Sequence, residues 1–93
     1  MKIETKCLHE GYHPKNTEPR VIPMVQSTTY VYDSTDDVAA VFDDPTKSLI
    51  YSRFENPTVM AVEEKIAALE GGAAAMATSS GQAATLCSLL NIC

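Results

Sequence analysis

The sequence predicts an α/β layer fold, present only in part, and three neighbouring segments in its second half support this prediction. Asn56-Pro57 is a start signal for a helix, and Gly71-Gly72 is a stop signal. Residues 73–78 are small and apolar, which is typical of a buried parallel strand. The Ser79-Ser80-Gly81 turn then opens a second helix. A helix, a buried strand and another helix in succession are typical of layered α/β proteins.

The length and charge of the chain limit the function classes that it can serve. Its 93 residues make at most one small domain, and a chain this short buries a small share of its surface. The 7 basic and 12 acidic residues give a formal net charge of -5, and the acidic residues are scattered. Nucleic acid and anionic membranes both require a basic face, so neither is expected as a partner.

The cysteines and histidines predict neither a disulfide framework nor a metal site. The 3 cysteines, Cys7, Cys87 and Cys93, have no CxxC spacing, and we expect free thiols that serve as small buried hydrophobic side chains in a reducing, cytoplasmic compartment. No signal peptide and no apolar run of membrane-spanning length is present. His9 and His13 have the i, i+4 spacing of a helical pair, but the nearby glycine and proline argue against a shared helix.

The first half of the chain predicts an arm followed by one short helix. Residues 1–20 are polar and contain one glycine and two prolines, so we expect an arm outside the core. Residues 21–32 are rich in β-branched and aromatic side chains, but Pro23 excludes a central strand, and this segment should run extended at an edge or over a surface. Asp33-Ser-Thr35 offers N-caps for a helix over 36–42, and residues 43–47 should form a loop.

The second half carries the elements that bear on function. Residues 49–54 predict a short extended segment in which alternation places Tyr51 and Arg53 on the same side of the backbone. The helix that starts at Asn56-Pro57 has an apolar face at helical spacing, made of Val59, Val62, Ile66 and Leu69. The last helix should present an apolar side made of Leu86, Leu89 and Leu90.

The turn at Ser79-Ser80-Gly81 is a candidate anion site. Amides at the start of a helix have no helical partner, and the helix dipole favours negative charge there. Glycine lets a ligand approach the backbone, and either serine can add a hydroxyl donor. Such a turn by itself is more often only a cap, and the dinucleotide glycine fingerprint and the P-loop motif are both absent.

Tyr51 and Arg53 would form a second anion grip. A phenol and a guanidinium on one side of an extended segment can both bind phosphate. Each residue by itself would equally suit a structural role, with the arginine in a surface ion pair and the tyrosine in a core. The two together, in the same chain as the serine-glycine turn, favour phosphate.

Several motifs together resemble the start of the Cys/Met-metabolism family of pyridoxal-phosphate enzymes. Their order and spacing fit across essentially the whole chain, and they are Gln26-Ser-Thr-Thr-Tyr30, Tyr51-Ser-Arg53, Asn56-Pro-Thr58, Leu69-Glu-Gly-Gly72 and Ser79-Ser-Gly-Gln-Ala-Ala84. The resemblance implies a fold-type I enzyme. Residues 1–57 would be an N-terminal arm and subunit-contact segment, and residues 58–93 would be the start of the large α/β cofactor-binding domain.

The resemblance also implies a cofactor site that is shared between subunits. The cofactor is pyridoxal 5'-phosphate, and in this family the backbone amides at the positions of Gly81 and Gln82, with the serine at Ser80, hold its phosphate. The residues at the positions of Tyr51 and Arg53 reach the same phosphate from the neighbouring subunit. A homo-oligomer is therefore implied, in which the two grips of one chain serve different cofactors.

Within the family, the motifs look most like the O-acetylhomoserine sulfhydrylase branch. Methionine γ-lyases usually have methionine where Gln82 stands, and methionine γ-lyase and cystathionine γ-synthase or lyase are the alternatives. The implied reaction is γ-replacement on an O-acetylhomoserine-like amino acid: acetate leaves Cγ, and sulfide or methanethiol adds to give homocysteine or methionine.

The residues that perform the chemistry in this family are not found in these 93 residues. The cofactor-binding lysine, the carboxylate for the pyridine nitrogen, the stacking ring and the substrate-binding arginine all lie beyond the position of Cys93 in the family. No lysine here has the required context, neither Lys2 and Lys6 nor Lys15, Lys47 and Lys65. The last helix also lacks a stop signal.

We therefore expect the N-terminal piece of a larger enzyme, with no catalytic residue of its own and inactive alone. The alternative from another class is a free-standing, non-catalytic oligomerisation module that keeps only the docking surface of the family.

Overall fold

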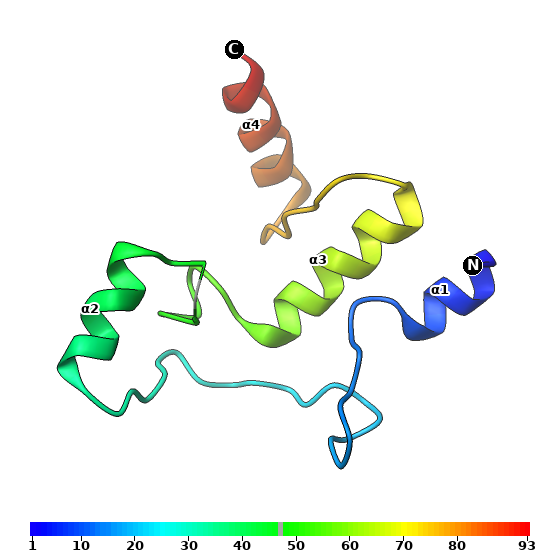
Figure 1. The fold of residues 1–93 in the computed structure, drawn as a ribbon. Helices are drawn as coiled ribbons and strands as arrows, with labels where there is room; N and C mark the ends of the chain where they lie inside the picture. Colours follow the sequence, from blue (N-terminus) through cyan, green and yellow to red (C-terminus); the bar gives the residue numbers. More distant parts are fainter. Residues whose placement is uncertain (47) are drawn as a thin grey trace.

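The computed structural model describes residues 1–46 and 48–93, and helices dominate it. In chain order these are α1 (Ile3–His9), α2 (Thr35–Asp43), α3 (Pro57–Glu70) and α4 (Gly81–Ile92) (Figure 1). Among the described residues no strand forms, and the one β-type pairing is an isolated antiparallel bridge between Thr29 and Tyr51. Lys47, the last residue of the predicted loop over 43–47, lies outside the described residues.

The signals at the two ends of α3 work as predicted. The Asn56 side chain accepts a hydrogen bond from the Thr58 amide at 2.9 Å, and Pro57 occupies the first helical position. Gly71 ends the helix with a φ of 68°, in the left-handed region that glycine enters at no steric cost. This helix lies at the centre of the ribbon, between α1 and α2 (Figure 1).

The capping serines of α2 and α4 also confirm the sequence prediction. Ser34 accepts from the Asp37 amide at 3.2 Å, so α2 extends the predicted helix over 36–42 by one residue at each end. Ser80 accepts from the Ala83 amide at 3.1 Å and fixes the start of α4. Both are serine caps with extended backbone, the geometry that an N-cap requires.

The predicted buried strand over 73–78 is wrong for this structure. The segment is extended but pairs with no strand among the described residues, and most of it is exposed. The Ala77 amide donates to a Glu63 side-chain oxygen at 2.8 Å in place of a neighbouring strand. A buried strand needs partners for its backbone groups, and residues 1–46 and 48–93 form no strand that could supply them, so the α/β layer is not formed there.

The N-terminal arm contains a helix that the sequence analysis missed. α1 docks on α3 through two long side chains: Lys6 Nζ donates to the Ala68 carbonyl at 3.2 Å, and Lys65 Nζ donates to the Cys7 carbonyl at 3.0 Å. The arm that was expected to lie outside the core therefore contacts α3 through its polar side chains. The absence of a helix through both His9 and His13 is confirmed, since α1 ends at His9.

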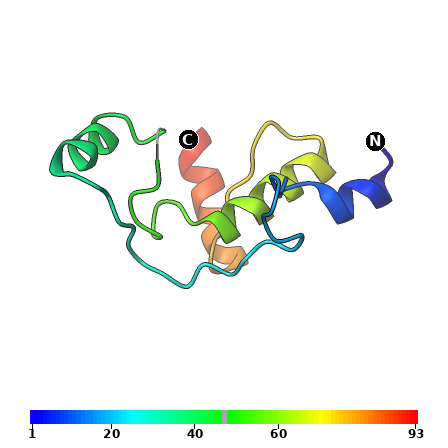
Figure 2. The same ribbon diagram turned by 60° about the horizontal axis from the view of Figure 1, so that its bottom comes forward.

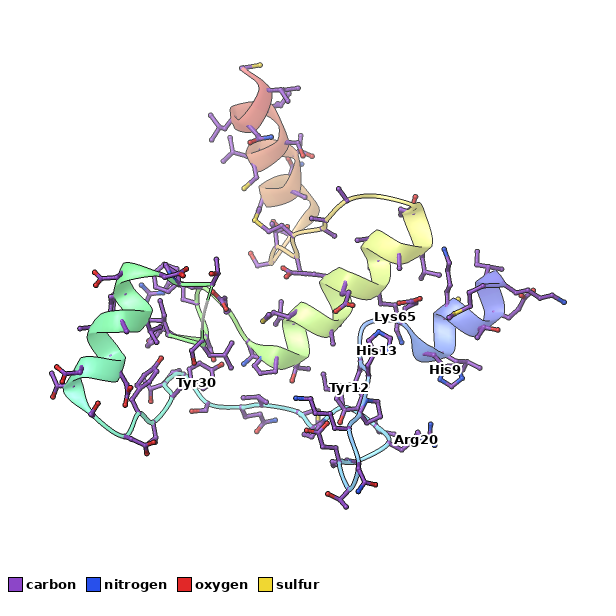
Figure 3. All side chains as sticks on the ribbon, viewed as in Figure 1. His9, Tyr12, His13, Arg20, Tyr30 and Lys65 are labelled. Atoms are coloured by element: carbon purple, nitrogen blue, oxygen red, sulfur yellow. The ribbon has the colours of Figure 1, made fainter. Side chains whose placement is uncertain are left out.

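Gly11 allows the arm to approach α3 closely. Its φ is +87°, and a Cβ atom at this position would lie 2.1 Å from the Ala61 carbonyl oxygen. Any other residue would therefore be strained and would push the arm away from α3. His9, His13 and Lys65 are labelled around this contact in Figure 3.

The molecule is broad and thin and has almost no core. Its extents are 43 × 42 × 21 Å, and the radius of gyration is 15.7 Å, against about 12 Å for a compact domain of this length. The thin dimension is evident when the ribbon is turned (Figure 2). Among the described residues the buried apolar side chains are Val41, Ala61 and Ala67.

The side chains expected to be apolar faces or buried thiols lie at the surface. Ile66, Leu86 and Leu89 are 48%, 57% and 53% exposed, so the apolar sides of α3 and α4 are open. Cys7, Cys87 and Cys93 are free, as predicted, but exposed, which overturns the expectation that they are buried. The described residues contribute too little apolar surface to cover these positions. No described helix is long and apolar enough to cross a bilayer.

Candidate cofactor-binding site

The segment that carries Tyr51 and Arg53 is a turn, in contrast to the predicted extended segment over 49–54. The extended backbone ends at Tyr51, which pairs with Thr29. The Tyr51 carbonyl then accepts from the amides of Phe54 and Glu55 at 2.9 and 3.0 Å, which closes a tight turn. Arg53 therefore stands on the turn and not on a strand.

The turn still brings the two predicted phosphate-binding side chains together. The Arg53 guanidinium carbon lies 5.3 Å from the centre of the Tyr51 ring, a cation–π distance. Tyr51 is half-buried and Arg53 is exposed. Among the described residues neither the phenol oxygen nor the guanidinium has a hydrogen-bond or ion-pair partner, so both remain available to an external anion.

The segment over 23–30 holds this turn in place, a role that the sequence analysis missed. The Ser52 amide donates to the Thr28 carbonyl at 2.9 Å. The Tyr30 hydroxyl lies 3.0 Å from Ser52 Oγ and 3.2 Å from the Glu55 carbonyl. Tyr30 is labelled in Figure 3 near the loop that follows α2. The sequence signal for this role is the polar run Gln26–Tyr30.

Asn56 ties the same segment to α3. Its Nδ2 atom donates to the Val25 carbonyl at 2.9 Å and to Ser52 Oγ at 3.1 Å. Thr58 Oγ1 accepts from the Val25 amide at 2.9 Å and donates to the Pro23 carbonyl at 3.0 Å. Asn56 is 8% exposed and is the buried polar residue among those described. Every polar atom of its amide is thus used, as burial requires.

The second predicted site lies at the start of α4. Ser80 Oγ already accepts the Ala83 amide, so its own hydrogen is free to donate to a ligand. Gly81 and Gln82 occupy the first turn, where amides have no helical carbonyl to donate to. A Cβ atom built on Gly81 would meet nothing within 4 Å. The backbone is therefore open to a ligand, and the positive end of a 12-residue helix faces it.

The structure does not join the two predicted sites within one chain. Tyr51 and Arg53 lie on the loop before α3, and Ser80, Gly81 and Gln82 lie at the start of α4 (Figure 1). Among the described residues no hydrogen bond or ion pair connects the two sets. Each set has groups of a kind that can bind an anion.

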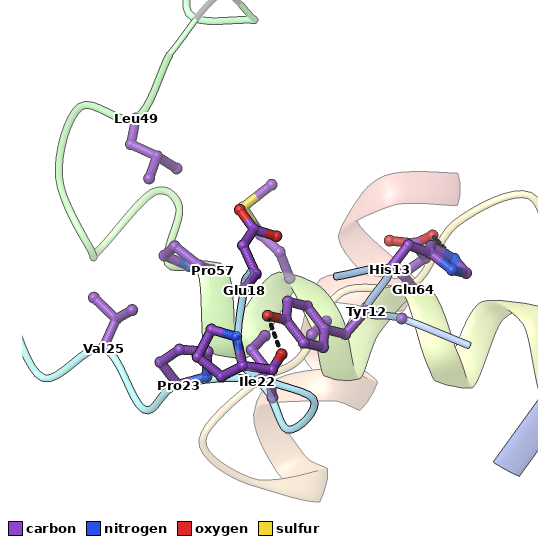
Figure 4. Close-up of a pocket in the computed structure, with 13 residues that line it drawn as sticks. Tyr12, His13, Glu18, Ile22, Pro23, Val25, Leu49, Pro57 and Glu64 are labelled. Atoms are coloured by element: carbon purple, nitrogen blue, oxygen red, sulfur yellow. Dashed lines mark hydrogen bonds and ion pairs between the residues drawn. The ribbon is translucent and has the colours of Figure 1, made fainter. Parts of the chain in front are cut away.

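A separate cavity lies between the arm and α3. It has a volume of about 510 Å³, and its lining includes Tyr12, Glu18, Ile22 and Met60 (Figure 4). The Tyr12 hydroxyl donates to the Pro19 carbonyl at 2.8 Å on its wall. None of the predicted cofactor-binding residues lines it, so we do not assign the cofactor here.

A cluster of ionisable residues at the arm also lies away from the predicted site. His13 Nε2 lies 3.9 Å from a carboxylate oxygen of Glu10 and 3.9 Å from one of Glu64. The three ligand atoms lie within 4.8 Å of one another. Glu64 and His13 are 60% and 67% exposed, and exposed clusters of this kind are common as surface ion pairs, so the cluster is not evidence for a metal.

Comparison with known proteins accounts for these motifs. Residues 4–93 match the sequence profile of the Cys/Met metabolism PLP-dependent enzymes. The chain belongs to this family. The members of this family depend on pyridoxal phosphate.

Individual relatives narrow the comparison. The chain is 47% identical over 93 residues to the O-acetyl-L-homoserine sulfhydrylase of Leptospira meyeri, covering 99% of this chain and 21% of that protein. It is 50% identical over 84 residues to the homocysteine/cysteine synthase of Kluyveromyces lactis, covering 88% and 19%. The chain thus spans about a fifth of the length of the curated relatives that it matches.

A solved structure shares the fold of this segment. A Campylobacter jejuni chain, named as an O-acetylhomoserine (thiol)-lyase and carrying N'-pyridoxyl-lysine-5'-monophosphate, superposes with a TM-score of 0.86 at 34% identity. The match covers 98% of this chain and 22% of the other. The open, core-poor shape described above is therefore the shape that this region has within a complete protein of the family.

Proposed function

We propose that this chain is the cofactor-gripping N-terminal part of a PLP-dependent O-acetylhomoserine sulfhydrylase. The observation that carries the proposal is the 47% identity to such an enzyme over 99% of the chain. The substrates would be an O-acetylhomoserine-like amino acid and sulfide or a thiol. The product would be homocysteine or methionine.

The donors at α4 fit the phosphate of the cofactor. Ser80 keeps a free hydroxyl hydrogen, the first-turn amides of Gly81 and Gln82 have no helical carbonyl to donate to, and the space beside Gly81 is open. These groups would hold the phosphate through hydrogen bonds to its oxygens, and the helix dipole would add to the attraction. When bound, the cofactor supplies the carbanion stabilisation that γ-replacement requires.

Tyr51 and Arg53 would grip the phosphate held by a second copy of the chain. Arg53 is exposed, and its stacking on Tyr51 keeps the guanidinium and the phenol on one side of the turn. Among the described residues no hydrogen bond or ion pair connects this turn with the start of α4 of the same chain, which supports a partner subunit as the recipient. The assembly would be a homo-oligomer in which residues 1–57 make the subunit contacts and residues 58–93 begin the cofactor-binding domain.

The test begins with the complete product of the gene that encodes this chain. Its intact mass is measured, and absorbance is scanned between about 400 and 430 nm, where lysine-bound pyridoxal phosphate absorbs. We expect a polypeptide longer than the 10.1 kDa chain, with this band and with homocysteine formation from O-acetylhomoserine and sulfide. A 10.1 kDa protein without the band would contradict the proposal. Methanethiol release from methionine without homocysteine formation would indicate a lyase instead.

A chimera allows the residues of this chain to be tested one at a time. In it, residues 1–93 replace the segment of the Leptospira meyeri sulfhydrylase that they match. The chimera should bind pyridoxal phosphate as the parent enzyme does. If a folded chimera does not retain the cofactor, these residues do not form the grip.

A further inference from the structure

Ser52 lies between the two phosphate-gripping residues and has the most connected side chain of the loop. Its hydroxyl donates to the Ser27 carbonyl, accepts from Asn56 Nδ2 at 3.1 Å, and lies 3.0 Å from the Tyr30 hydroxyl. Its amide donates to the Thr28 carbonyl at 2.9 Å. The bonds reach residues 22 to 25 positions away in the chain, as well as the cap of α3.

The hydrogens of this network can be assigned by counting. Ser52 has one hydroxyl hydrogen, which it gives to the Ser27 carbonyl. Its two lone pairs then accept from Asn56 and Tyr30. The Tyr30 hydroxyl hydrogen is shared between Ser52 Oγ at 3.0 Å and the Glu55 carbonyl at 3.2 Å, and the longer bond is the weaker one. Each capacity of the Ser52 hydroxyl is therefore filled, which fixes the orientation of its side chain.

The fixed Ser52 side chain constrains the residues on both sides of it. Tyr51 and Arg53 belong to a turn closed only by bonds to the Tyr51 carbonyl, and neither of their side-chain tips has a partner among the described residues. The orientation of the guanidinium thus depends on the backbone, and Ser52 anchors the backbone. Without this anchor the turn would sample more conformations, and binding the phosphate would lose more conformational entropy and be weaker.

We propose that Ser52 is a positioning residue for the phosphate grip, with Tyr30 and Asn56 holding it in place. It acts through Arg53 and does not touch the cofactor. The inference rests on the proposed function, because it assumes that Arg53 binds the phosphate.

The test measures the pyridoxal-phosphate dissociation constant of the chimera by titration of the cofactor-free protein. Ser52→Ala should weaken binding about two- to tenfold, the effect of one lost hydrogen-bond anchor. Arg53→Ala should weaken it roughly ten- to a hundredfold. The double variant should bind no more weakly than Arg53→Ala, because Ser52 acts through Arg53. Ser52→Thr keeps the hydroxyl and should restore the original affinity.

The outcomes separate the inference from the proposed function. If Arg53→Ala leaves the affinity unchanged, the phosphate role fails and the inference fails with it. If Arg53→Ala weakens binding but Ser52→Ala does not, only the inference is overturned. Fully additive effects in the double variant would mean that Ser52 affects folding and not the grip, and would overturn it as well.

Matched controls remove single hydroxyls elsewhere in the structure. Ser27→Ala removes a hydroxyl from the same segment but leaves the carbonyl that Ser52 uses, and it should not change the affinity.

If Ser52→Ala fails to fold, Tyr30→Phe removes one donor to Ser52 and keeps the ring. Tyr12→Phe is its control, since the Tyr12 hydroxyl bonds only the Pro19 carbonyl, in the arm. Tyr30→Phe must weaken binding more than Tyr12→Phe, or the inference is wrong.

Discussion

At the scale of single residues, the proposed phosphate binding depends on groups that have no partner among the described residues. The Arg53 guanidinium and the Tyr51 phenol are stacked and unpaired among the described residues. The Gly81 and Gln82 amides at the start of α4 also lack a helical partner, because the first turn of a helix has no preceding carbonyl to accept from them. Neighbouring polar groups such as the Asn56 amide are fully paired. The unpaired groups are those proposed to bind phosphate, and the paired groups hold the structure around them.

The first prediction concerns Arg53 in the chimera. Arg53→Ala should raise the dissociation constant of pyridoxal phosphate by an amount worth about 1.5 to 3 kcal/mol, because one charge-assisted contact is lost. Arg53→Lys should recover only part of this loss, since an ammonium cannot form the forked contact. Titration of the cofactor-free protein gives both values.

Arg20 provides the control for charge. It is exposed on the arm and apart from the Tyr51–Arg53 turn (Figure 3). Arg20→Ala changes the net charge by the same amount and should leave cofactor binding unchanged. Equal losses for the two alanine variants would indicate a general charge effect.

The second prediction concerns Gly11. Gly11→Ala should destabilise the chimera by about 1 to 3 kcal/mol, because the residue has a positive φ and its Cβ would collide with the Ala61 carbonyl. Gly72→Ala is the matched control, since its Cβ would make only ordinary contacts at 3.7 Å and beyond. Thermal unfolding compares the two. A melting temperature that is no lower for Gly11→Ala would contradict the close contact of the arm with α3.

At the scale of elements, the helix ends are where sequence and structure agree best. Asn56, Ser34 and Ser80 cap their helices as predicted, and Gly71 stops α3. These signals are local: a cap needs only a side chain and an amide two or three residues away. The segment over 73–78 was mispredicted because a strand is defined by its partner and not by its own residues.

The third prediction compares two of these caps. Asn56→Ala should cost more stability in the chimera than Ser34→Ala. The serine loses a cap worth about 1 kcal/mol. The asparagine loses its cap and leaves the Val25 carbonyl without its donor in a partly buried place, a further cost of about 1 to 3 kcal/mol. Denaturant unfolding measures both, and equal losses would mean that Asn56 acts only as a cap.

At the scale of the whole molecule, the described part of the chain has almost no core. Its radius of gyration exceeds that of a compact domain of equal length. Apolar side chains on α3 and α4 are open, and α1 docks through lysine contacts to carbonyl groups. A stable fold needs this apolar surface covered.

The fourth prediction follows from this exposure. The isolated 93-residue chain should self-associate or be partly disordered, because Val59, Ile66, Leu86 and Leu89 are 43% to 57% exposed. Sedimentation and calorimetry test this, and Leu86→Glu with Leu89→Glu should reduce association. A monomer with a sharp cooperative melting transition would show that the chain folds independently.

The sequence by itself determined α2, α3 and α4, their caps, the family and the groups proposed to bind phosphate. Each of these depends on residues close together in the chain or on an ordered set of short motifs. Only the tertiary structure decided that the arm docks on α3 at Gly11, that Tyr51 and Arg53 stand on a turn, and that Ser52 is anchored by Tyr30 and Asn56. The docked arm and the Tyr30–Ser52 contact join residues that are far apart in the sequence. Asn56 is close to Ser52 in the sequence, but its side chain links Ser52 to the distant Val25. The periodicity of one segment contains no information about which distant segment will pair with it.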